Sequence, residues 1–111
     1  MTDVVDIRKS DDRRDIIHRA CELLTEGRLV ACATETLYVA VASALNPAGV
    51  AKLLSQSREN RAVLLLKSFE ELRDYVTELP HVAKKLAKRC WPGPLIMTFS
   101  ADMANGLYSA L

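Results

Sequence analysis

The sequence predicts a mixed α/β fold, an open sheet with flanking helices. Short apolar runs of strand length alternate along the chain with segments whose apolar residues recur at helical spacing. The chain has 111 residues, 50% apolar and 26% charged, which is ordinary for one folded domain. We therefore predict a single domain over residues 1–111.

Four helices are predicted from capping residues and helical periodicity. They run from Asp11 or Asp12 to about Glu26, from Asn46-Pro47 onward, from Ser68 to about Val76, and from Pro80 to about Cys90. Gly27 stands where a C-terminal glycine cap belongs, and Ser68 with Glu71 matches a capping box. The last helix is expected to turn its apolar residues inward: Val82, Ala83, Leu86, Ala87 and Cys90.

Five short apolar runs predict strands: Val4 to Ile7, Arg28 to Thr34, Leu37 to Ala44, Ala62 to Leu66, and Leu95 to Phe99. The run Ala62 to Leu66 is apolar throughout, which is typical of a strand covered on both faces. Prolines end the last helix at Trp91, and Asp102 to Gly106 is predicted as a turn.

Composition limits the possible partners and compartments. The net charge of +1 gives no overall basic bias, so nucleic-acid binding would need a local patch. Cys21, Cys32 and Cys90 match neither zinc-site nor redox spacing, and we expect buried, reduced thiols. His18 and His81 lack neighbouring ligands, so no metal site is expected. The N-terminus lacks an apolar signal core, which predicts a cytoplasmic protein without a membrane partner.

The segment Thr34-Glu35-Thr36-Leu37-Tyr38 lies between two predicted strands. Hydroxyl groups and one carboxylate at a strand end suit hydrogen bonding to a small polar ligand. A tight connection whose threonines bond their own backbone explains the same residues. Both interpretations stay open on spacing alone.

Two groups of basic residues offer contacts for anions. Arg58 and Arg61 precede an apolar run and could fork around a phosphate, or belong to a solvated loop. One predicted helix face carries four cations that could hold an RNA backbone, or that only keep the helix soluble: Lys84, Lys85, Lys88 and Arg89.

Taken in order, these segments resemble the YrdC/YciO family. GRLVACATETLYVAVASAL is similar to that family's Pro-Thr-Glu-Thr-x-Tyr-Gly-Leu segment, and WPGPL to its Trp-Pro-Gly-Pro-Leu-Thr motif. The resemblance covers about Ile16 to Phe99. It implies a twisted, open YrdC-like sheet, truncated here at its C-terminal side. It also implies a family that condenses L-threonine, bicarbonate and ATP into threonylcarbamoyl-adenylate for tRNA modification, on a fold also described as binding double-stranded RNA.

The resemblance assigns expected roles. Thr34, Glu35, Thr36 and Tyr38 would surround threonine and adenylate, Arg58 and Arg61 would bind phosphate, and Trp91 to Pro94 would form a structural turn. No catalytic residue is identified.

The sequence also departs from the family pattern. The leading Pro is Ala33, the Gly is Val39, and the Lys-x-Arg-Pro loop expected at Ser55 to Arg61 has neither lysine nor proline. The histidine at the end of the next strand is missing, as is the later Ser-x-Asn motif.

Three functions follow from the resemblance and these departures. The first is a catalytically degenerate YrdC-like domain that binds nucleotide or double-stranded RNA in threonylcarbamoyladenosine biosynthesis. The alternatives are an active threonylcarbamoyl-AMP synthase, with ATP and Mg²⁺ as substrate, and a non-catalytic scaffold or interaction subunit. A sheet cut short leaves an open edge, so self-association or a partner chain is also expected.

Overall fold

A computed structural model describes residues 2–9 and 11–100, which form two compact units. The first unit comprises residues 1–34 and 38–60, and the second comprises residues 35–37 and 61–111. The described residues contain α-helices together with one two-stranded antiparallel sheet, so the predicted mixed α/β class is confirmed. The turn predicted at Asp102 to Gly106 lies outside the described residues.

In the first unit, helix α1 (Arg13–Thr25) begins and ends as its sequence predicts. The Asp12 side chain accepts a hydrogen bond from the backbone N–H of Arg14 at 2.9 Å, which satisfies one unpaired donor of the first turn. Gly27 has a φ of 81°, and the N–H of Arg28 donates back to the last turn. This is a glycine-terminated Schellman motif, in which a residue without Cβ adopts the left-handed conformation.

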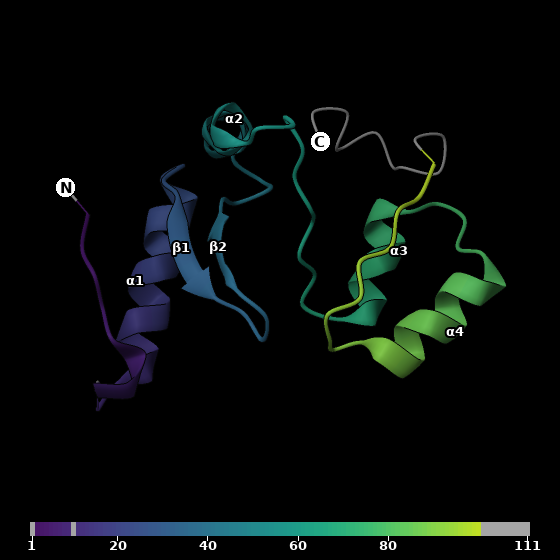
Figure 1. Cartoon of the computed structure of the whole chain (residues 1–111), viewed down its shortest axis with the longest axis horizontal. Coiled ribbons are helices and arrows are strands. Elements are labelled where there is room, and N and C mark those ends of the chain that lie inside the picture. Colours follow the sequence, from purple (N-terminus) through teal and green to yellow (C-terminus); the bar gives the residue numbers. More distant parts are fainter. Residues whose placement is uncertain (1, 10, 101–111) are drawn as a thin grey trace. The chain divides into compact units, whose positions relative to one another are not determined.

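The predicted first strand, Val4 to Ile7, is wrong. The segment has no strand partner among the described residues, and a 3-10 helix η1 (Ile7–Lys9) follows it. Figure 1 shows this N-terminal segment running beside α1, and Arg19 Nη2 lies 3.1 Å from Asp3 Oδ2. Ion pairing along a helix thus replaces the β-pairing that the apolar pattern predicted.

Strands β1 (Val30–Ala33) and β2 (Tyr38–Val41) form an antiparallel hairpin that packs on α1 (Figure 1). In its register Cys32 is opposite Val39 and Ala33 is opposite Tyr38. Residues directly opposite in an antiparallel pair point to the same face. Cys32 and Val39 are half-buried, so they mark the covered face, and Tyr38 lies on the open one.

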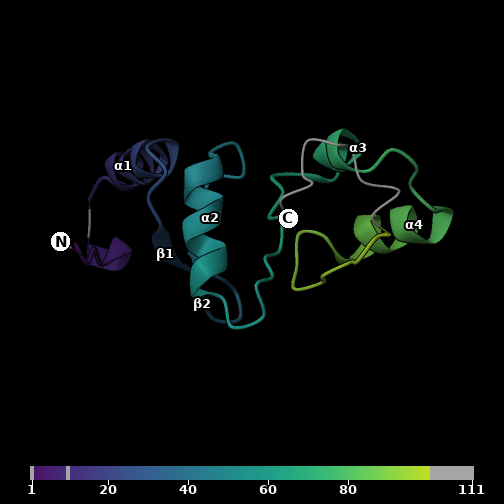
Figure 2. The same ribbon diagram turned by 90° about the horizontal axis from the view of Figure 1, so that it is seen from above.

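Helix α2 (Pro47–Gln56) belongs to the same unit as α1 (Figure 2), and the Asn46 side chain attaches its start to the end of α1. The Asn46 side-chain oxygen accepts a hydrogen bond from the N–H of Gly49 at 3.1 Å, and the Asn46 side-chain nitrogen donates one to the Thr25 carbonyl at 3.0 Å. Gly27 lies directly under this side chain, since a Cβ there would come within 2.9 Å of the Asn46 oxygen. One residue therefore caps α2 and ties it to α1.

The second unit contains the short helices η2 (Phe69–Glu71) and α3 (Leu72–Tyr75) and the longer helix α4 (His81–Cys90). The predicted capping box at Ser68 is wrong in detail. Ser68 makes no side-chain cap, and Glu71 instead accepts the backbone N–H of Lys67 at 2.9 Å. The pKa of Glu70 lies below its ordinary value. The larger cause is a hydrogen bond from its own backbone N–H, and the second is a hydrogen bond with the Ser68 hydroxyl.

The core of the second unit is small. Among the described residues of this unit, the buried apolar ones are Leu72, Val76, Ala83 and Ala87. The prediction that Val82, Leu86 and Cys90 also face inward is wrong, because all three are exposed. Only the alanine stripe of α4 is covered, so the wider apolar face remains open.

Two predicted strands of this unit, Ala62 to Leu66 and Leu95 to Phe99, contain no regular secondary structure, so their prediction as strands is wrong. The one sheet among the described residues is the β1–β2 pair. Figure 1 shows both segments as open chain. A strand assignment requires hydrogen bonds to a neighbour, which an apolar pattern cannot supply.

The described helices include none that is long and apolar enough to cross a bilayer. All three cysteines are free thiols. The prediction that they are buried is wrong for Cys21 and Cys90, which are exposed, while Cys32 is half-buried.

Candidate functional site

The loop of the candidate ligand site is the tip of the β1–β2 hairpin. The register closes at Ala33 and Tyr38, so residues 34–37 form the tip. Glu35, Thr36 and Leu37 are exposed, and Thr34 is half-buried. Thr34, Thr36 and Leu37 already take part in interactions within the chain. The hairpin thus explains the position of the loop at the end of two paired strands.

The predicted site residues are divided between the two units. Thr34, Tyr38 and Arg58 belong to the first unit. Glu35, Thr36 and Arg61 belong to the second unit, together with all of α4. The hairpin residues and the two arginines are therefore each divided between the units, whereas the cations of α4 all lie in the second.

Tyr38 lies on the open face of the hairpin, beside its tip. Its side chain is 80% exposed. In the same unit the pKa of Arg8 is raised above its ordinary value, chiefly because the Asp6 carboxylate receives two hydrogen bonds from the Arg8 guanidinium, each 3.1 Å long. The same contact holds the pKa of Asp6 below its ordinary value. The Asp6–Arg8 pair thus fixes a cation within the first unit.

Val39 occupies the place of the family's glycine next to Tyr38. It is half-buried on the covered face of the hairpin, opposite Cys32. Its bulk therefore lies among the packing residues of the first unit and away from the face that presents Tyr38.

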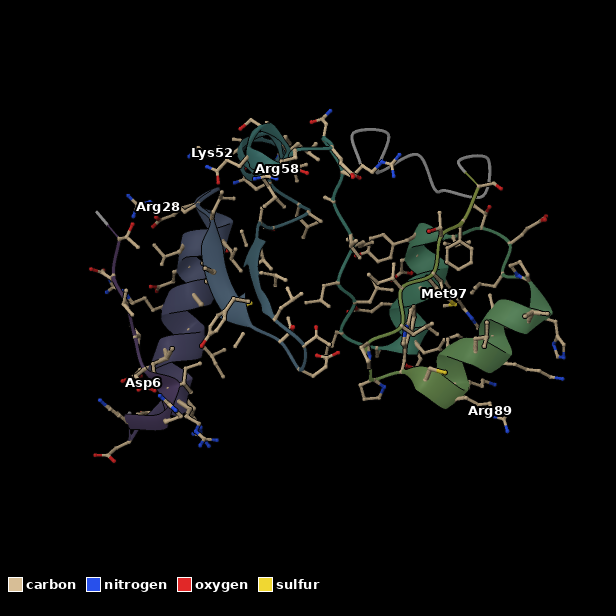
Figure 3. The ribbon with its side chains drawn as sticks, in the orientation of Figure 1. Asp6, Arg28, Lys52, Arg58, Arg89 and Met97 are labelled. Carbon is tan, nitrogen blue, oxygen red and sulfur yellow. The ribbon has the colours of Figure 1, made fainter. Side chains whose placement is uncertain are left out.

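Arg58 and Arg61 flank a turn that follows α2. Ser57 ends the helix, and Asn60 closes the turn with a φ of 52° and an N–H bond to the Ser57 carbonyl of 3.3 Å. Asparagine tolerates the left-handed region better than most residues, which explains its use here. Both arginines are exposed (Figure 3 labels Arg58), and Arg61 makes a further contact within the chain.

The cations of α4 lie on the side of the helix opposite its buried alanines. Lys85, Lys88 and Arg89 are exposed and Lys84 is half-buried, whereas Ala83 and Ala87 are buried. Figure 3 shows Arg89 extending away from the unit. The positions of the four cations, i, i+1, i+4 and i+5, form one stripe along the helix. The sequence prediction of an outward basic face is confirmed for Lys85, Lys88 and Arg89.

One lysine of this stripe also has a packing contact. Lys88 Nζ lies 5.9 Å from the centre of the Phe69 ring, within the range of a cation–π interaction. Lys88 and Arg89 also occupy the last turn of α4, where the helix dipole favours positive charge. The cationic face is thus held in place by its own helix and by η2.

The other side of α4 borders an open depression of about 370 Å³. Its lining includes Val82, Leu86, Met97 and Phe99 and contains no charged residue. An uncharged, apolar lining does not suit a phosphate-bearing ligand. None of the predicted site residues lies in it.

The WPGP segment forms a compact turn after α4. The Trp91 indole N–H donates to the Leu95 carbonyl at 2.8 Å, and the Trp91–Pro92 peptide is cis. A Cβ on Gly93 would collide with the Cys90 carbonyl oxygen, so only glycine fits. The geometry supports a structural part for this motif.

No group of three or more histidine, cysteine, aspartate or glutamate residues within the described ranges could hold a metal ion.

Comparison with known proteins identifies the class. The family model for Sua5, YciO and YrdC, described as "Telomere recombination", matches residues 22–110. That is most of the chain, and the chain belongs to this family.

Two curated relatives carry the name threonylcarbamoyl-AMP synthase. The chain is 35% identical over 100 residues to the Pyrococcus abyssi protein, covering 87% of this chain and 29% of that relative. It is 34% identical over 98 residues to the Bacillus subtilis protein, covering 86% of this chain and 28% of that relative. The chain thus spans less than a third of the length of either. No solved structure matches the chain at a significant level.

Proposed function

We propose that this chain is a YrdC-type module of tRNA threonylcarbamoyladenosine biosynthesis that binds double-stranded RNA through α4 and has no catalysis of its own. The observation that carries this proposal is the cationic stripe Lys84, Lys85, Lys88 and Arg89. The stripe lies on one helix, opposite a buried alanine face. It therefore does not depend on how the two units are placed.

The spacing of the stripe suits a polyphosphate backbone. At a rise of ~1.5 Å per residue, the stripe from residue 84 to residue 89 extends over about 7.5 Å. Duplex RNA is recognised mainly through its shape and its phosphate and 2′-hydroxyl groups, which lysine and arginine contact without reading sequence. This favours RNA over a single small anion as the ligand of α4.

The lack of catalysis is proposed from the same residues that relate the chain to its family. Adenylate transfer needs fixed cations beside the phosphate that reacts. No lysine occurs in residues 53–66, and Ala33 and Val39 replace the Pro and Gly of the ligand loop. The arginines that remain, Arg58 and Arg61, are both exposed.

A second candidate function is the binding of a nucleotide, such as ATP with Mg²⁺, at the hairpin tip. It is favoured by Tyr38, whose side chain is 80% exposed on the open face of the hairpin. An exposed aromatic ring can stack on a nucleotide base. Calorimetric titration with ATP and Mg²⁺ tests this candidate. If ATP binds at the hairpin tip, the wild-type chain releases or absorbs heat on titration, and Tyr38→Ala should abolish that heat.

The test of RNA binding is a charge-reversal pair. We expect Lys85→Glu combined with Lys88→Glu to weaken binding of a labelled RNA duplex at least tenfold, because two phosphate contacts become repulsive. Arg28→Glu combined with Lys52→Glu is the matched control, since it makes the same change in net charge at exposed residues of the first unit (Figure 3). Equal losses in both pairs would contradict a site on α4.

The alternative of an active synthase has its own test. With ATP, L-threonine and bicarbonate, we expect no pyrophosphate release above background. Turnover that Thr36→Ala abolishes would establish a synthase in place of a binding module.

A further inference from the structure

Phe69, the first residue of η2, lies under the end of one cation of α4. Lys88 Nζ is 5.9 Å from the centre of the Phe69 ring and over it. Both residues belong to the second unit, so the contact does not depend on how the two units are placed. Phe69 is half-buried and Lys88 is exposed, so a partly packed ring contacts a cation that solvent can reach.

The backbone of η2 holds Phe69 in place. The Phe69 carbonyl accepts a hydrogen bond from the N–H of Leu72, and Leu72 is buried in the core of the unit. The Lys67 N–H donates to the Glu71 carboxylate at 2.9 Å, a bond that joins the residues on either side of Phe69. The position of the ring is therefore set by η2 itself and needs no contribution from Lys88.

Lys85 offers a direct comparison with Lys88. Both lysines are exposed, lie on the same helix and belong to the same cationic stripe. Of the α4 cations, all of which lie within the described residues, Lys88 is the one that contacts an aromatic ring. The ring is thus a feature by which two otherwise similar side chains differ.

An aromatic ring positions a cation without neutralising it. The ring attracts the ammonium through its quadrupole, so the charge of Lys88 remains available, whereas a carboxylate partner would offset that charge. An ammonium has three N–H donors and no acceptor, and a ring on one side leaves donors for a phosphate oxygen. A flexible lysine loses rotamer freedom when a ligand fixes it, and a side chain that is held beforehand loses less.

We propose that Phe69 is a positioning residue of the RNA site, whose ring holds Lys88 in a restricted set of rotamers from which its ammonium donates to a phosphate of an RNA duplex. Phe69 acts through Lys88 and makes no contact with the RNA itself. This inference rests on the proposed function and adds to the site a residue outside α4, which neither the charge pattern nor the family motifs assign.

A double-mutant cycle on the binding of a labelled RNA duplex tests the proposal. We expect Phe69→Leu to weaken binding about two- to fivefold, which corresponds to the loss of one exposed cation–π contact. Because the ring acts through Lys88, Phe69→Leu should have no effect in a chain that carries Lys88→Ala. Lys85→Ala is the matched control, and Phe69→Leu should have its full effect in that chain. Phe69→Tyr keeps an aromatic face and should retain wild-type affinity.

Nuclear magnetic resonance of the full chain without RNA measures the contact itself. Protons over the face of an aromatic ring resonate upfield, so we expect the ε-methylene protons of Lys88 to lie upfield of those of Lys85. Phe69→Leu should remove this difference, and Phe69→Tyr should keep it. The readout separates loss of the contact from a general loosening of the second unit, because loosening would also move the indole signal of Trp91, which belongs to that unit.

Equal effects of Phe69→Leu in the Lys85→Ala and Lys88→Ala chains would overturn the proposal, as would ε-methylene protons of Lys88 that are not shifted upfield. In either case RNA binding by the wild-type chain would still be measured, so the proposed function would survive. A wild-type chain that binds no RNA duplex would contradict the proposed function and, with it, the part of Phe69.

Discussion

Asn46 joins the end of α1 to the start of α2, and replacing it tests the packing of the first unit. Asn46→Ala removes the cap on the Gly49 N–H and the bond to the Thr25 carbonyl, 3.1 and 3.0 Å long. Loss of an N-cap costs ~1 kcal/mol, and loss of a second hydrogen bond costs about as much. We therefore expect Asn46→Ala to lower the free energy of unfolding by about 2 kcal/mol.

Asn46→Asp separates the two bonds. A carboxylate can still accept the Gly49 N–H, but it has no N–H to donate to Thr25. We expect this variant to lose about 1 kcal/mol, half the effect of alanine.

Urea unfolding followed by far-ultraviolet circular dichroism measures both variants. With a denaturant slope of about 1.5 kcal/mol/M, a loss of 2 kcal/mol lowers the midpoint by about 1.3 M. Trp91 fluorescence provides an internal reference, because the single tryptophan belongs to the second unit. Equal midpoints for Asn46→Ala and Asn46→Asp, or a shift below about 0.3 M for both, would refute the two-bond account.

Three further predictions concern other parts of the fold. Gly27→Ala should destabilise the first unit by about 1–2 kcal/mol in urea unfolding, because its φ of 81° disfavours a Cβ; no change would contradict a left-handed cap. Trp91→Phe should cost about 1 kcal/mol by losing the indole bond to Leu95, and a neutral result would show that this bond contributes nothing. The pKa of Asp6 is held below 3.8 by Arg8, so its stabilising effect is present above that pH and is lost as pH falls through the lowered value. The melting-temperature difference between wild type and Asp6→Asn should therefore be constant from neutral pH down to about 3.8 and should vanish as pH falls through the lowered pKa of Asp6; a difference that persists well below that pH would contradict this.

The first unit could be predicted from sequence because its signals are local. A cap at Asp12, a left-handed glycine at Gly27 and the Asn46-Pro47 pair each act within a few residues. The hairpin followed from two apolar runs separated by a polar loop. Short-range hydrogen bonding therefore determines most of this unit.

The second unit could be predicted less well because its elements depend on partners. Ala62 to Leu66 and Leu95 to Phe99 have strand composition, but the described residues give them no neighbour. The helical period predicted α4 correctly, yet Ala83 and Ala87 are the only residues of this helix that are buried. An apolar pattern shows which residues prefer burial, not whether a surface is present to bury them.

The candidate site shows the same limit. Sequence located the hairpin tip and the basic face of α4. It did not indicate that Lys88 lies over the Phe69 ring, because nineteen positions separate them and no motif joins them. Contacts between distant segments require the fold.

The salt dependence of RNA binding tests the central claim most directly. If all four cations of α4 contact phosphates, the logarithm of affinity for an RNA duplex falls against the logarithm of salt concentration with a slope of about −3.6, or about 150-fold between roughly 50 and 200 mM. The slope should become clearly shallower in the variant that combines Lys85→Glu with Lys88→Glu. A flat response in the wild-type chain, or a slope that the two reversals leave unchanged, would contradict RNA binding by α4.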